Sequence, residues 1–234
     1  KAAPSRLKQH NMAPITDHQV YIRAFFDMID MYLLKDLKTL INEIPPREQG
    51  GGAGYPGLHS ILSGMELLGL IASGEIGASA FNSYWSNYLS KKFPEYNIPG
   101  LKDIFRQVMR NGTAHLFLVK SGISISKHGT HHLETVRSNG EILLNIDLKT
   151  LYSHFLEIYR RIKRELLSNP PVAGCNQFQK QMEEAYAKVS SFIRTNHPTS
   201  TSTSTGVSTN PTDTSATRLS GLGAMTTPPP HWNQ

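Results

Sequence analysis

Cysteine is almost absent from this sequence, which contains a single one, Cys175. One cysteine forms no intramolecular disulfide, and the chain has no Cys/His pattern of the kind that binds structural zinc. This composition favours a reducing compartment, and we expect a cytoplasmic protein. We expect neither a metal ion nor a cofactor.

Long hydrophobic runs are also lacking. The most apolar stretch, residues 57–73, is interrupted by Glu66 and by several glycines, so no segment reaches the length of a membrane span. The first eleven residues are basic and polar, without the apolar centre of a signal peptide. The glycine-rich stretch 49–57 lacks the Gly-Lys-Ser/Thr ending of a phosphate-binding loop. We therefore expect a connector at that point and no membrane partner.

The two ends of the chain differ in composition from its centre. Serine and threonine dominate residues 195–217, and Pro228-Pro229-Pro230 follows. Such a segment cannot bury enough apolar surface to order itself. The sequence predicts a disordered tail over residues 195–234 and a disordered or vector-derived N-terminus over residues 1–15.

Apolar residues recur at steps of three or four between these ends, which is the pattern of amphipathic helices. Paired prolines at 45–46 and 170–171 end two of the segments. The expected fold class is mainly α, a helical bundle spanning residues 16–194. The spacing predicts helices over residues 16–44, 58–72, 78–91, 101–115, 147–167 and 176–194.

The period changes after the fourth predicted helix. Apolar and polar residues alternate near residues 123–126, and two further runs, 132–137 and 141–146, flank Ser138-Asn139-Gly140. Asn-Gly is a strong signal for a two-residue hairpin. We predict a small antiparallel sheet of two or three strands, inserted at about residues 117–146.

The stretch Arg110-Asn111-Gly112-Thr113-Ala114-His115 combines a cation, an amide and an imidazole. RNA cleavage by a 2′-hydroxyl needs a base, an acid and a cation that stabilises the crowded phosphate. His115 is the candidate for proton transfer, and Arg110 is the candidate phosphate clamp. Asn111, four residues before His115, can orient the imidazole. Glu66 either fixes the Arg110 guanidinium or faces water.

The spacing of Arg110 and His115 sets a geometric condition. Residues five apart on an ideal α-helix point about 140° apart, so the two side chains meet only if the helix is distorted near Gly112. The motif also contains only one histidine, whereas the reaction needs both a general acid and a general base. The chemistry therefore predicts a two-fold homodimer with the motif helices at its axis. A simpler interpretation stays open, because Arg and His near a helix C-terminus complement its dipole.

Basic residues outside the motif are candidates for RNA binding. Arg106 lies one helical turn before the motif and is a supplementary phosphate contact. Lys120, Lys127 and His131 are candidates for lining a groove beyond it. Lys127 and His131 belong to a histidine-rich turn, 127–132, which is otherwise a solvated turn and lacks carboxylate or cysteine support for a metal. The formal net charge of +6 fits a polyanionic partner without requiring one.

The motif and its surroundings resemble the HEPN domain family. The similarity rests on Arg110-Asn111-x-x-x-His115, on the preceding Phe105-Arg106-Gln107-Val108-Met109, and on the helix order over about residues 17–167. It implies a dimeric, metal-independent endoribonuclease with Arg110 and His115 as catalytic residues and Asn111 as their polar partner. Such proteins often belong to toxin–antitoxin or antiviral systems, which implies RNA and an antitoxin or regulatory protein as partners. The alternative is an inactive module of this type that binds a protein or a nucleotide.

Overall fold

The computed structural model describes residues 17–45, 53–110, 122–138 and 140–196, and 76% of these residues are helical. The predicted mainly α fold with a small sheet is confirmed. The chain divides into two compact units, Lys1–Gln179 and Lys180–Gln234. The predicted N-terminal segment 1–15 and all but the first two residues of the predicted tail lie outside the described residues.

A continuous helix from Asp17 to Glu43 forms the first part of the bundle. Its segments η1 and η2 are π-helical, and its inward face carries Ile22, Phe25, Phe26, Ile29, Leu37 and Ile41. Ile44 adopts an extended backbone, as a residue before proline prefers. The four segments are α1 (Asp17–Met28), η1 (Ile29–Leu34), α2 (Lys35–Lys38) and η2 (Thr39–Glu43).

Helix α3 (Gly54–Ser73) packs closely on α4 (Gly77–Tyr84). A Cβ atom added at Gly69 would lie 1.9 Å from the carbonyl oxygen of Ala80, so only glycine permits this approach. Among the residues that the structure describes, no single helix has both the length and the hydropathy to cross a membrane. Helix α3 meets that test only jointly with Gly77–Lys92, across a bend of 89°.

The middle of the chain forms short helical segments around an aromatic core. The ring of Trp85 lies edge-on to Tyr96 and to Phe105, with centroid separations of 5.5 and 5.1 Å. The last of these segments, η5, is π-helical and packs on α3. In chain order the segments after α4 are η3 (Trp85–Leu89), α5 (Ser90–Lys92), η4 (Pro94–Asn97), α6 (Leu101–Asp103) and η5 (Ile104–Arg110).

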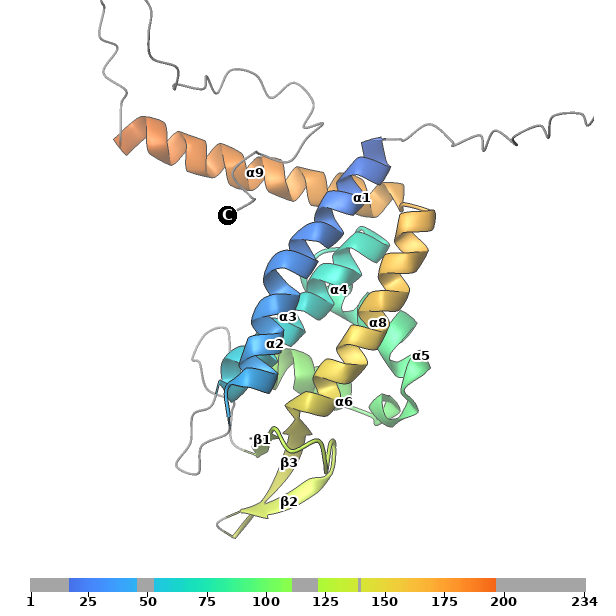
Figure 1. Ribbon diagram of the computed structural model, residues 1–234, viewed down its shortest axis with the longest axis vertical. Coiled ribbons are helices and arrows are strands. Elements are labelled where there is room, and N and C mark those ends of the chain that lie inside the picture. The colour runs from blue at the N-terminus through green and yellow to red at the C-terminus, as the bar shows by residue number, and fades with distance from the viewer. Residues whose placement is uncertain (1–16, 46–52, 111–121, 139, 197–234) are drawn as a thin grey trace, which may run out of the picture. The chain divides into compact units, whose positions relative to one another are not determined.

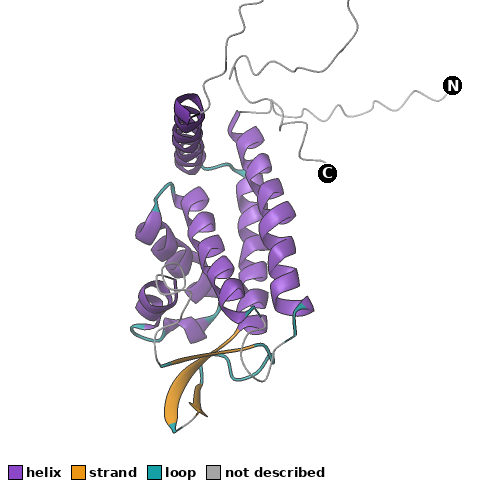
Figure 2. Ribbon diagram, turned by 90° about the vertical axis from the view of Figure 1, so that its left-hand side faces the viewer, coloured by secondary structure: helices purple, strands orange, loops and turns teal. Residues whose placement is uncertain are grey.

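The sheet has three strands in the order β1-β3-β2, and it lies at one end of the helices of the first unit (Figure 2). The predicted hairpin is confirmed, because β2 (Thr135–Ser138) pairs antiparallel with β3 (Glu141–Asp147). The prediction of a wholly antiparallel sheet is wrong, since β1 (Ile123–Ser126) runs parallel to β3. Alternating residues predict a strand but not its direction, and the edge of β3 not used by the hairpin was open to β1.

Helix α8 (Leu148–Ser168) follows β3 directly and runs beside the first helix of the bundle (Figure 1). Its inward face carries Leu151, Phe155, Ile158 and Ile162. Helix α9 (Val172–Asn196) begins against the same core. Cys175 is 1% exposed, and the ring of Phe178 lies 5.1 Å from that of Phe25.

Candidate functional site

The predicted catalytic motif lies mostly outside the described residues. The backbone of Arg110 is the end of η5, and nothing is described of its side chain or of Asn111, His115 and Lys120. The predicted catalytic arrangement, with Lys120 as an RNA contact, stays a prediction.

The helix that leads into the motif differs from the expected α-helix. Segment η5 is π-helical up to Arg110, and its buried Phe105 and Met109 anchor it in the core. A π-helix forms i→i+5 hydrogen bonds, and such segments are frequent at functional sites. The angle of about 140° expected between Arg110 and His115 applies to residues that begin where η5 ends, and all of them after Arg110 lie outside the described residues.

Arg106 lies on η5, four residues before Arg110, with its side chain 30% exposed. Its Nη2 lies 3.7 Å from Asp103 Oδ1. Its buried Nε has no hydrogen-bond partner among the described residues. Leaving such a donor unsatisfied costs about 1–3 kcal/mol. The exposed part of the guanidinium can still donate to a phosphate. Arg106 therefore remains a candidate phosphate contact.

Glu66 is half-buried on α3, the helix against which η5 packs. Its predicted partner is the guanidinium of Arg110, which lies outside the described side chains. The orienting role of Glu66 stays a prediction, although both residues belong to elements in contact.

Lys127 is 5% exposed, which does not support the predicted RNA contact. Its Nζ donates hydrogen bonds to the carbonyl oxygens of Leu40, at 2.5 Å, and Ile44, at 3.1 Å. These carbonyls belong to the end of the first helix, where a cation complements the helix dipole. Burial, with the charge of Lys149, lowers the pKa of Lys127. The ammonium group thus closes a helix inside the protein.

His131 is exposed, and its Nδ1 lies 2.8 Å from Glu134 Oε2. This surface position leaves the predicted RNA contact open. The turn as a whole is not the solvated loop that its composition suggested, because Lys127 is buried and His132 is half-buried.

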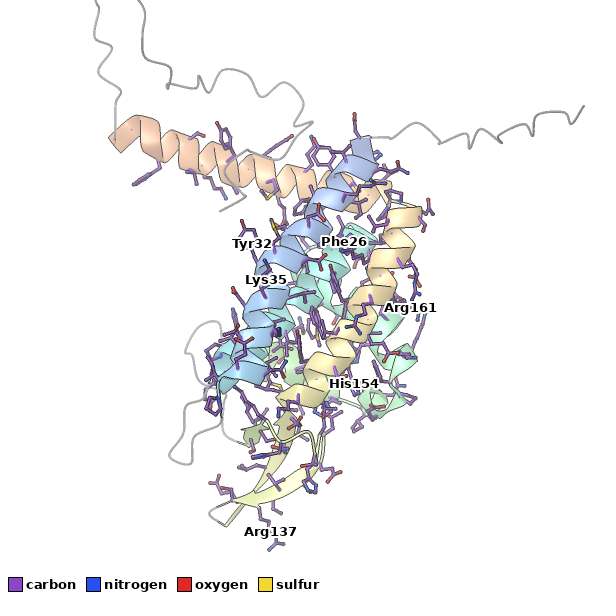
Figure 3. All side chains as sticks on the ribbon, in the orientation of Figure 1. Phe26, Tyr32, Lys35, Arg137, His154 and Arg161 are labelled. Carbon is purple, nitrogen blue, oxygen red and sulfur yellow. The ribbon has the colours of Figure 1, made fainter. Side chains whose placement is uncertain are left out.

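Three side chains that the sequence did not bring together meet where the sheet joins the bundle. The hydroxyl oxygen of Tyr96 lies 2.8 Å from His132 Nε2 and 3.0 Å from His154 Nδ1. Tyr96 comes from η4, and His132 comes from the turn before β2. His154 comes from the beginning of α8 (Figure 3). Phe93 stacks on His154 with ring centroids 3.9 Å apart.

The hydrogen-bond partners fix the direction of every proton in this cluster. The backbone N–H of Asp147 donates to His132 Nδ1 at 3.1 Å, so the neutral ring carries its proton on Nε2. That Nε2–H donates to the hydroxyl oxygen of Tyr96, which in turn donates to His154 Nδ1. The proton of His154 is then on Nε2, 3.9 Å from Glu95 Oε1. The result is a directed chain from the sheet to the surface of α8.

Burial holds the members of this chain in their neutral forms. It lowers the pKa of His132 to about 4, with His154 acting in the same direction and Asp147 opposing. Burial also lowers the pKa of His154, against the effect of Glu95 and Glu157. It raises the pKa of the Tyr96 hydroxyl well above its ordinary value. Both nitrogens of His132 are engaged, so His154 Nε2 is the end at which the chain can exchange protons.

The turn that carries His132 is strained. His131 and Leu133 have φ values of +56° and +61°, in the left-handed region that favours glycine. Such residues cost on the order of 1 kcal/mol each and persist where surrounding contacts determine them. Asn145 supplies these contacts. Its side-chain Nδ2 donates to the backbone oxygen of His131 at 2.8 Å, and its backbone carbonyl oxygen accepts from the N–H of Leu133 at 2.9 Å.

Asp147 holds the other side of the turn. Its carboxylate is fully buried and accepts from the N–H and hydroxyl of Thr150, from Gly129 N and from Ser126 Oγ, at 2.9–3.0 Å. Burial would raise its pKa, but these four hydrogen bonds outweigh burial and lower it. Asp147 is therefore an ionised N-cap of α8 that also fixes β1 and the turn.

No family profile, curated protein or solved structure matches this chain. Within the described ranges, no group of three His, Cys, Asp or Glu residues is arranged to hold a metal ion.

Sequence reasoning missed the Tyr96–His132–His154 chain because its members lie far apart. Tyr96 is 36 residues from His132 and 58 from His154. One signal was present: His154 directly precedes the inward-facing Phe155, at the border of the apolar face of α8. Polar side chains that are buried usually have a hydrogen-bond partner, so a histidine at this border predicts one.

Proposed function

We propose that this chain is a metal-independent endoribonuclease of the HEPN type. Arg110 stabilises the charge on the reacting phosphate, His115 transfers protons, and Asn111 orients the imidazole. The observation that carries the proposal is Arg106, which lies four residues before Arg110 on a helix anchored in the core. Its guanidinium is partly exposed, and its buried Nε has no hydrogen-bond partner among the described residues. We expect the guanidinium of Arg106 to add to that of Arg110 in binding phosphate, since the two positions are four residues apart in the sequence.

The reaction requires no external reagent. A base removes the proton of the 2′-hydroxyl, whose oxygen forms a bond to the adjacent phosphorus. The bond from phosphorus to the 5′-oxygen breaks, and an acid protonates that oxygen. The products are a 2′,3′-cyclic phosphate and a 5′-hydroxyl. A homodimer with the motif at its interface supplies a second imidazole, so that one acts as base and the other as acid.

The proposed setting follows from the same resemblance. The substrate is RNA, which the net charge of +6 favours. A toxin or antiviral enzyme of this kind acts in the cytoplasm and has an antitoxin or regulatory protein as partner.

The test is cleavage of single-stranded RNA by the full chain in EDTA, with identification of the product ends. We expect 2′,3′-cyclic phosphate ends from the wild type and no cleavage of RNA methylated at the 2′-oxygens. His115→Ala and Arg110→Ala should each reduce the rate by at least about 100-fold, the usual contribution of acid–base or charge stabilisation.

Two surface variants provide matched controls. His128→Ala removes an exposed histidine from the turn, and Arg137→Ala removes an exposed arginine from β2 (Figure 3). Both should cleave as the wild type does. Equal cleavage by all five proteins, or none by folded wild type over a range of RNA sequences, would contradict the proposal.

A non-catalytic helical module that binds a protein or a nucleotide is the second candidate. The observation that favours a protein partner is on α9, where Met182, Tyr186 and Val189 are each more than half exposed. Folded wild type that binds a partner yet leaves RNA intact would favour this function.

A further inference from the structure

The second half of α9, Lys180–Asn196, carries an apolar stripe on its surface. The α9 stripe consists of Met182, Tyr186, Val189 and Phe192, which are 51%, 54%, 57% and 61% exposed. Their steps of four, three and three residues place them on one side of the helix. Contiguous apolar surface of this kind marks an interaction site more often than a solvated face.

Three residues of the α9 stripe have the spacing of one heptad of a coiled-coil seam. Met182, Tyr186 and Val189 take the d, a and d positions of a heptad, and Phe192 borders them at g. Such a seam suits another helix with the same spacing. A second copy of α9 provides it.

Charge selects the orientation of that second helix. Residues 180–187 contain Lys180, Glu183 and Glu184, which leaves one net negative charge. Residues 188–196 contain Lys188 and Arg194 and no acidic residue, which gives two positive charges. An antiparallel pair brings each negative half against a positive half, whereas a parallel pair brings like halves together.

We propose that two copies of this chain associate through the α9 stripe as an antiparallel helix pair. Tyr186 of one copy packs on Val189 of the second copy, and a two-fold axis passes between the two contacts. The arrangement is isologous, so it closes as a dimer. It does not depend on the proposed ribonuclease activity.

The size of the surface sets the expected strength. Lys180–Asn196 is about 25 Å long at 1.5 Å per residue. Two such helices bury on the order of 1,000 Å² in total, at the lower end of specific interfaces. We therefore expect a reversible dimer with a dissociation constant on the order of micromolar.

The experiment is light scattering of the full chain across a concentration series. The mass of the wild type should double as concentration rises, starting from 26.0 kDa for a single chain or from twice that value for a dimer through the motif. Tyr186→Glu should raise the dissociation constant at least about 30-fold, the effect of removing a central apolar anchor. Ala187→Glu adds the same charge on the opposite side of the helix and should leave the dimer intact. Circular dichroism of both variants checks that α9 remains helical.

Three outcomes would overturn the proposal. A wild type that stays monomeric would show that another segment or another protein covers the α9 stripe. A Tyr186→Glu dimer as strong as the wild type would assign association to a different surface, such as the motif. If Ala187→Glu weakened the dimer as much as Tyr186→Glu does, the contact would not be confined to the side of α9 that carries the stripe. RNA cleavage is a separate readout, because neither substitution touches the motif.

Disulfide trapping tests the orientation. In the antiparallel register that aligns Tyr186 with Val189, positions 183 and 190 of opposite helices border each other on one flank. In a Cys175→Ser background, Glu183→Cys and Ser190→Cys should form a disulfide dimer only after the two proteins are mixed. Equally efficient trapping in each unmixed sample would contradict the antiparallel pair.

Discussion

His132 has a protonation state set by its surroundings. Its Nδ1 accepts a hydrogen bond from the backbone N–H of Asp147, and its Nε2–H donates one to the hydroxyl oxygen of Tyr96. A second proton on the ring would face the Asp147 N–H and break that bond. The structure around the turn therefore requires a neutral imidazole.

This requirement predicts a pH-dependent stability. The pKa of His132 is lowered to about 4 in the folded chain, against about 6.5 when unfolded, so the unfolded state binds its proton first as pH falls. The stabilisation is fully present above pH 6.5 and is lost between about pH 6.5 and 4, by at most about 3 kcal/mol. Urea unfolding of the wild type, His132→Gln and the exposed-site control His131→Gln measures it.

The His132→Gln protein should lose less stability than the wild type over this pH range, and His131→Gln should follow the wild type. Parallel pH profiles for all three proteins would show that His132 does not provide the coupling.

The surroundings of these residues could be predicted from the sequence where their partners are close in the chain, and not where their partners are far away in it. The composition of the turn indicated an exposed histidine, and His131 is exposed. It did not indicate that Lys127 caps a helix more than 80 residues earlier, or that His132 meets Tyr96. Tertiary hydrogen bonds decide both positions, and no periodicity encodes them.

At the scale of elements, the positions of the helices could be predicted because the apolar residues that face the core recur at helical spacing. The first predicted helix, 16–44, corresponds to Asp17–Glu43, and 147–167 corresponds to α8. The Asn-Gly hairpin also follows from local turn chemistry, and Gly140 has a φ of +84°. The π-helical geometry and the direction of β1 depend on packing partners, which is why the pattern alone did not give them.

The approach of α3 to α4 predicts opposite effects at two buried glycines of α3. Gly69→Ala should lower the free energy of unfolding by more than about 3 kcal/mol, because its Cβ would lie 1.9 Å from the Ala80 carbonyl. Gly57→Ala is the matched control, since its Cβ would meet Ile41 and Leu148 at an ordinary 3.5 Å. That variant should be neutral or stabilising by up to about 1 kcal/mol.

Denaturant unfolding of both variants measures this difference in the free energy of unfolding. Similar midpoints for Gly69→Ala and Gly57→Ala would mean that the two helices separate easily and that the close approach has no structural weight.

At the scale of the whole molecule, the hydrophobic core that the structure describes belongs to the first of the two compact units. Every buried apolar side chain that the structure describes lies between Ile22 and Cys175, within Lys1–Gln179. We therefore expect the residues beyond Gln179 to contribute little to the stability of this core.

A stop codon after Gln179 should separate the two properties. The shortened chain retains Cys175 and Phe178, so its free energy of unfolding should change by less than about 1 kcal/mol. It should lack the association through the α9 stripe at concentrations where the full chain shows it. A large loss of stability would show that the last unit supports the fold, which thermal and denaturant unfolding would both reveal.

The position of β3 at the centre of the sheet has a consequence for synthesis of the chain. It is the last strand to leave the ribosome, yet both other strands pair with it, so β1 and β2 emerge without partners. Asp147, its final residue, also starts α8 and orients His132. The sheet, the helix cap and the histidine chain thus form together when one short segment becomes available. Until then the preceding helices expose apolar surface, so a nascent chain paused before residue 147 is accessible to chaperones and proteases.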